Sequence, residues 1–108
     1  MANRHKDFDE LVASQFEDLD FAVAYISNLI NEEELSLEEA LRETIVSMGL
    51  KAFADRAGIS IQYVSDFVKK RRNLSTNAIA KYLHRAFNLK VRISVEPDAA
   101  WFSFHKNS

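Results

Sequence analysis

Residues 50–69 constrain the fold more than any other part of this chain. They contain two short runs of apolar residues at helical spacing, separated by Gly58. Two helices can cross at close range only if the residues at their contact are small, and Ala54 stands in the middle of the first run. Gly58 stands where a tight turn needs a positive φ, which most other residues adopt only at a cost. The stretch therefore predicts two short helices, over residues 50–57 and 60–71, joined by a sharp turn.

The rest of the chain is also dominated by helical patterns. Apolar spacing predicts further helices over residues 7–17, 21–29, 36–48 and 76–88. The expected N-caps are Asp20, Ser36, Ser60 and Ser75. In the helix over residues 60–71, the side chains expected to be buried are Ile61, Val64, Phe67 and Val68.

The pattern changes near the C-terminal end. Val91, Ile93 and Val95 alternate with polar residues, which predicts a short strand, and residues 100–104 follow as a candidate second strand. With 2 Gly and 1 Pro in 108 residues, the chain is too poor in turn residues for a β-sandwich. We therefore expect an all-α bundle with an N-terminal helical extension and a short C-terminal β-strand or hairpin. The expected parts are an acidic helical segment (1–35), a helix-turn-helix domain with its strand (36–96) and a tail (97–108).

The net charge of −2 conceals an uneven distribution of charge. Residues 1–49 carry 3 basic and 12 acidic side chains, whereas residues 50–108 carry 11 basic and 4 acidic ones. A basic half favours a polyanion such as nucleic acid, and an acidic half suits a basic protein. The alternative interpretation is that both sets of charges are solvated helix faces.

Several classes of protein are disfavoured by what the sequence does not contain. It has no Cys, which excludes disulfides and thiolate metal sites. His5, His84 and His105 lack the spacing of metal ligands, so we expect no metal. Glycine-rich phosphate loops and nucleophile motifs are missing, so we expect no enzyme and no cofactor. No apolar run approaches the length of about 18 residues that a membrane span needs, and residues 1–8 lack a signal-peptide core, so a cytoplasmic protein is expected.

Ala54, Gly58, Val64 and Phe67 resemble the small, turn and core residues of one helix-turn-helix family, the phage-repressor and Cro-like (XRE-type) DNA-binding proteins. Residues 73–76 look like the loop that opens the next helix of that fold, and residues 89–93 look like the tail after it. An acidic helical segment before the domain and residues 93–97 after it are similar to the addiction-module antidote proteins, which are HigA-like antitoxins.

This resemblance implies a phage-repressor-like bundle that binds double-stranded operator DNA as a homodimer. It also implies a transcriptional repressor that represses its own operon. The acidic helices over residues 8–31 would then help to bind a basic ribonuclease toxin of the RelE/HigB kind. Two rival functions remain open: a phage regulator without a toxin partner, and a protein-interaction module that has lost DNA binding.

In such proteins the second helix enters the major groove and its N-terminal part contacts base edges. The outward positions, which are the predicted base contacts, are Ser60, Gln62, Tyr63, Ser65, Asp66 and Lys69. The Gln62 amide is suited to bidentate pairing with adenine. Asp66 either accepts from a cytosine amine or pairs with Lys69 or Lys70. The alternative is that these are ordinary exposed helix residues.

Four consecutive cations at residues 69–72 close this helix. Cations at a helix C-terminus are favoured by the macrodipole, but four in a row exceed what the macrodipole explains. The predicted phosphate contacts are Lys51, Lys70, Arg71, Arg72, Asn73, Ser75 and Thr76. Phosphate contacts position a protein on DNA and supply affinity without choosing a sequence.

A candidate dimer interface lies at the C-terminal end. A short strand is not stable alone, and the residues after it are unusually apolar for a tail. The predicted interface residues are Val91, Ile93, Val95, Trp101 and Phe102. The alternatives are a hairpin within the chain, and packing of the tail onto the helices of its own domain.

Overall fold

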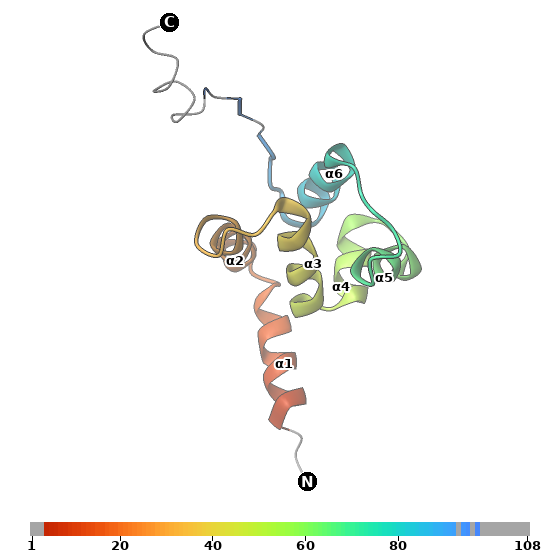
Figure 1. The fold of residues 1–108 in the computed structure, drawn as a ribbon. Coiled ribbons are helices and arrows are strands. Elements are labelled where there is room, and N and C mark those ends of the chain that lie inside the picture. Colours follow the sequence, from red (N-terminus) through yellow and green to blue (C-terminus); the bar gives the residue numbers. More distant parts are fainter. Residues whose placement is uncertain (1–3, 93, 96, 98–108) are drawn as a thin grey trace, which may run out of the picture.

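Six helices pack into one bundle in the part of the chain that the computed structural model describes, which is residues 4–92, 94, 95 and 97 (Figure 1). The helices are α1 (Arg4–Gln15), α2 (Leu19–Asn31), α3 (Leu37–Met48), α4 (Leu50–Ala57), α5 (Ile61–Val68) and α6 (Thr76–Phe87). No described residue belongs to a strand, so the expected all-α class is confirmed. Within the same residues, no helix combines the length and the apolarity that crossing a membrane requires.

Helix α3 lies at the centre of the bundle and packs against each of the other five helices. The acidic N-terminal helices belong to the same core as the rest, because Phe16 just after α1 and Ile26 of α2 share one buried cluster with Phe67 of α5. The Phe16 ring is 1% exposed and meets the rings of Phe21 and Tyr25 edge-on, with 5.0 Å between centroids in each pair. One continuous core therefore supports the buried side of α5.

Serine caps begin three of the helices as expected. The Ser36, Ser60 and Ser75 hydroxyls each accept a hydrogen bond, at 3.1 Å, from a backbone N–H in the first turn of the helix that follows. Such caps satisfy donors that the first turn leaves unpaired. The prediction of Asp20 as a cap is wrong: α2 begins two residues earlier, because the Asp18 carboxylate reaches the backbone N–H of Asp20 at 2.9 Å.

The described residues of the expected C-terminal strand do not form a strand. Val91, Ser94 and Val95 lie outside any strand, and Ile93 and the candidate second strand at 100–104 lie outside the described residues. A single strand needs a partner for its backbone groups. Leu89 and Val91 instead pack their half-buried side chains against the helical core.

Candidate nucleic-acid interface

The sharp turn predicted at Gly58 is confirmed. Three residues separate α4 from α5, and Gly58 adopts the left-handed conformation with φ +71° and ψ +36°. The backbone N–H groups of Gly58 and Ile59 both donate to the Ala54 carbonyl, at 2.9 and 3.0 Å, and so close α4. The buried residues where the two helices meet are Ala54, Ala57, Val64 and Phe67. The small side chains on α4 allow α5 to pack closely against it.

Arg42 of α3 holds the far end of α5, which the sequence did not reveal. Its Nε donates to the Phe67 carbonyl at 2.9 Å, and its guanidinium lies 4.5 Å from the centroid of the Phe67 ring. Its Nη2 donates to Glu38 at 3.0 Å. The spacing of Glu38 and Arg42 is visible in the sequence as an i, i+4 pair. The contact with Phe67 is not visible, because it joins residues far apart in the chain.

The second helix is shorter than predicted. It ends at Val68 rather than near Arg71, because Lys70 turns to a left-handed φ of +63°. The Arg71 N–H then donates to the Asp66 carbonyl at 2.8 Å, and the Lys70 N–H donates to the Phe67 carbonyl at 3.1 Å. This is the Schellman arrangement that closes many helices. The cations at 69–72 therefore lie on a turn beyond the helix instead of on its last turn.

This basic turn is open to solvent. Lys69, Lys70, Arg71 and Arg72 are all exposed. Within the residues that the structure describes, none of the four forms an ion pair with a carboxylate, since the ion pair found there joins Arg42 to Glu38. Their charges are thus not neutralised within the described part of the chain, which leaves them available to a polyanion.

The predicted base contacts lie on α5 and at its two ends, and Gln62 is the exposed one among those within the helix. Ser60, Gln62 and Lys69 are exposed, and Tyr63, Ser65 and Asp66 are half-buried. The Ser60 hydroxyl is engaged as the cap of α5, since it accepts from the Tyr63 N–H. Helix α5 turns Val64 and Phe67 toward the core, so Gln62 on its opposite side is exposed to solvent.

Ile61 was expected to be buried, and this prediction is wrong. The residue is 48% exposed. At 100° per residue, Ile61 lies on the flank of α5 rather than on the face that Val64 and Phe67 turn to the core. The apolar side chain of Ile61 is therefore exposed beside Gln62, although the periodicity of the sequence predicted that it is buried.

Gln62 and Asp66 form a hydrogen-bonded pair on the exposed face. Gln62 Nε2 donates to Asp66 Oδ1 at 2.9 Å, so Asp66 pairs with Gln62 and not with Lys69 or Lys70. An ionised carboxylate only accepts, so the amide must turn its NH₂ group toward Asp66. One N–H and the carbonyl oxygen of Gln62 stay available, and these are the donor and acceptor that adenine requires.

Tyr63 supports the basic turn. The Arg72 guanidinium lies over its ring, 4.3 Å from the centroid, and the Tyr82 ring of α6 meets it edge-on at 6.0 Å. The pKa of Tyr82 is raised above the ordinary 10.0. The larger cause is a hydrogen bond to the Tyr63 phenol, and the smaller cause is burial. Through its contacts with Arg72 and with Tyr82, Tyr63 links α5 to the basic turn and to α6.

The remaining predicted contacts are distributed around this surface. Lys51, Asn73, Ser75 and Thr76 are exposed, and the Ser75 hydroxyl is engaged as the cap of α6. Among the predicted dimer residues, Val91 is half-buried against its own core and Val95 is 94% exposed. Trp101 and Phe102, like Ile93, lie outside the described residues.

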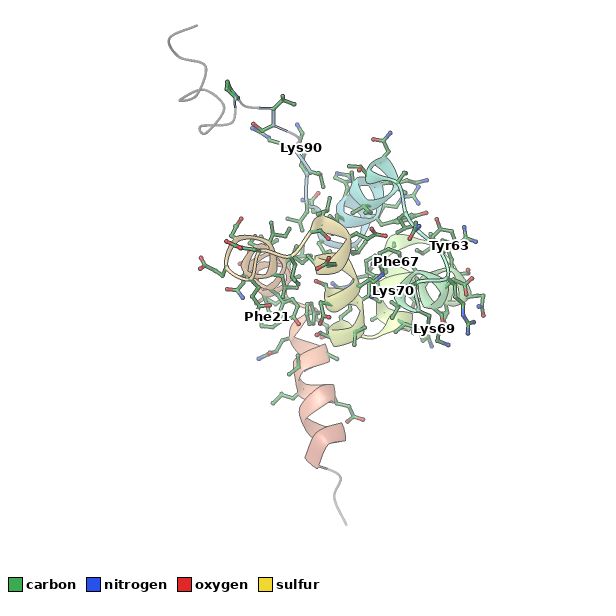
Figure 2. All side chains as sticks on the ribbon, in the orientation of Figure 1. Phe21, Tyr63, Phe67, Lys69, Lys70 and Lys90 are labelled. Atoms are coloured by element: carbon green, nitrogen blue, oxygen red, sulfur yellow. The ribbon has the colours of Figure 1, made fainter. Side chains whose placement is uncertain are left out.

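The acidic N-terminal helices do not cover α5. Helix α1 packs on α3, and α2 packs on α3 and α6, whereas α5 packs mainly on α3 and α4. In Figure 1, α2 and α5 lie on opposite sides of α3, and α1 extends below α3. Figure 2 shows Tyr63, Lys69 and Lys70 on one side of the molecule and Phe21 of α2 on the other. Helices α1 and α2 thus leave the exposed face of α5 free.

Comparison of the chain with protein-family models, with curated proteins and with solved structures found no match. No cluster of three or more metal-binding side chains occurs in the described residues. The function is therefore inferred from the geometry and charge of this surface.

Proposed function

We propose that this protein is a sequence-specific DNA-binding repressor of the phage-repressor-like helix-turn-helix type, acting as a dimer. One observation carries the proposal: an uncovered face of α5, with the Gln62 amide displayed on it, leads directly into the exposed basic turn at 69–72. The major groove admits an α-helix, and phosphates line its edges. A helix that displays a polar reading face and ends in cations fits both features.

The surface divides into two kinds of contact. The cations at 69–72, with Lys51, bind phosphates and give affinity that depends on salt. Gln62, oriented by Asp66 at 2.9 Å, reads adenine through its free N–H and its carbonyl oxygen. Ile61, 48% exposed beside it, offers apolar contact to a thymine methyl group. Affinity and sequence choice thus come from different residues.

The Gln62→Ala variant tests the reading of bases. A binding site is first selected from random duplexes, and each base pair of that site is then varied. The variant should lose discrimination at one position by about 1–3 kcal/mol, while its affinity for unrelated DNA is retained. The matched control is Gln15→Ala, since Gln15 is an exposed residue of α1. Equal loss on the selected and the unrelated DNA would contradict base reading by Gln62.

The same selection separates the proposal from the rival of an interaction module. Non-specific DNA binding is strongest at low salt. If no duplex is enriched even there, the protein does not bind DNA and the proposal fails.

The resemblance to antidote proteins supports a further proposal, that a basic toxin binds the acidic N-terminal part. Glu32, Glu33 and Glu34 form an exposed acidic loop after α2. Deleting residues 1–34 would not test this, because Phe16 and Ile26 belong to the core. Reversing the three glutamates to lysine is the cleaner change, because it leaves the core intact.

With the toxin proposal correct, the triple charge reversal should abolish rescue of cells that express the small basic protein encoded by an adjacent gene. Binding of the variant to the selected DNA is the control, and it should be unchanged. Intact rescue by a folded, DNA-binding variant would overturn the role of this acidic loop.

A further inference from the structure

An apolar groove lies away from the basic turn. It has a volume of about 330 Å³, and its apolar walls are Ile26, Ile30, Leu37, Leu83, Leu89 and Val91. These residues come from α2, the start of α3, the end of α6 and the segment after α6. Figure 2 shows Lys90, which also lines the groove, well apart from Lys69 and Lys70. The groove is therefore separate from the proposed DNA-binding surface.

The groove has the size and character of a site for aromatic rings. An apolar cavity of about 150 Å³ is enough to hold benzene, so about 330 Å³ offers room for two rings. Ile30, Leu37, Leu89 and Val91 are each only half-buried. No described part of the chain fills the space, so these side chains have apolar surface left to cover.

The chain itself supplies a matching segment. Val91 and Arg92 line the groove, and the sixteen residues after Arg92 include Trp101, Phe102 and Phe104. Trp101 is the ninth residue after Arg92, which allows a reach of up to about 30 Å. Pro97 lies in between and favours a change of direction. The aromatic residues are thus tethered to the wall of the groove by a connection long enough to return to it.

Charge favours the same pairing. The cationic residues that line the groove, Lys90 and Arg92, are exposed. The connection that leads to Trp101 carries Glu96 and Asp98. Opposite charges therefore flank the two apolar surfaces, and these are the only acidic residues after Asp66 in the sequence.

We propose that residues 101–104 dock into the groove of their own chain. The groove offers apolar walls with a cationic border, and the segment offers aromatic rings preceded by acids. The proposal does not depend on DNA binding, because the groove and α5 share no residue.

Trp101 is the single tryptophan, so its fluorescence reports on the segment in the full-length protein. Docking should place its emission to the blue of a free tryptophan amide and protect it from acrylamide quenching. Val91→Lys puts a charge into the groove and should shift the emission to the red. The matched control is Val46→Lys, because Val46 is 59% exposed and lies more than two helical turns along α3 from Leu37. This control should leave the emission unchanged.

A second measurement guards against a loss of fold in Val91→Lys. In the Trp101→Ser variant, the NMR methyl signals of Ile30 and Leu37 should shift, since a ring that packs on them is removed. Trp101 emission equal to that of the free amide would overturn the proposal, as would emission that Val91→Lys does not alter. A blue shift that appears only as protein concentration rises would also overturn it, because the segment of a second copy would then fill the groove.

Discussion

The double variant Lys70→Gly, Arg71→Ala is expected to bind every DNA sequence about thirtyfold more weakly near physiological salt of about 0.15 M. Each lost phosphate contact lowers the slope of log affinity against log salt by about 0.9. Two lost contacts therefore lower it by about two units. Selected and unrelated duplexes should be affected alike, because phosphates carry no sequence information.

Glycine is the appropriate replacement at position 70. Lys70 has a φ of +63°, which glycine adopts without cost, so the closure of α5 is retained while the charge is removed. The control variant is Lys90→Ala with Arg92→Ala, which removes two exposed cations from the groove. Titration of salt in a gel-shift or anisotropy assay measures both slopes. An unchanged slope in the first variant, or equal losses in both, would contradict phosphate binding by the basic turn.

The Arg42→Ala variant is expected to lower the free energy of unfolding by about 2–3 kcal/mol. It removes a charged hydrogen bond to the Phe67 carbonyl and the contact of the guanidinium with the Phe67 ring. Because Phe67 lies in the last turn of α5, DNA affinity should fall as well. Denaturant unfolding measures the first effect, and binding to the selected site measures the second.

Glu38→Gln is the matched control for Arg42→Ala. It weakens the ion pair at 3.0 Å but leaves both contacts with Phe67 in place. Pairs of this kind on a helix surface contribute only about 0.5 kcal/mol. If Glu38→Gln destabilises the protein as much as Arg42→Ala does, the ion pair and not the contact with Phe67 accounts for the lost stability.

Local signals predicted much of the fold and the position of the candidate site. Ser36, Ser60 and Ser75 begin helices because a hydroxyl needs only the first turn after it to form its bond. Gly58 turns the chain because its own missing side chain permits a φ of +71°. The prediction of Asp20 as the N-cap is also wrong for a local reason, since Asp18 provides a competing carboxylate two residues earlier.

The prediction of a strand is wrong at Val91, Ser94 and Val95, because alternation within one segment does not by itself create backbone pairing. Val91 alternates with its polar neighbours, as a strand residue does, but it packs on the helical core. Part of its apolar surface is buried there without backbone pairing to a neighbouring strand.

The sequence by itself determined the all-α class, the turn at Gly58 and the separation of acidic and basic halves, because each depends on neighbouring residues or on composition. Only the tertiary structure decided that Arg42 reaches Phe67, that Ile61 faces solvent and that α2, α6 and Val91 enclose a groove. These features depend on how helices distant in sequence pack together. The burial of a side chain at the edge of an apolar face is set by the neighbouring helix, which the periodicity of its own helix does not specify.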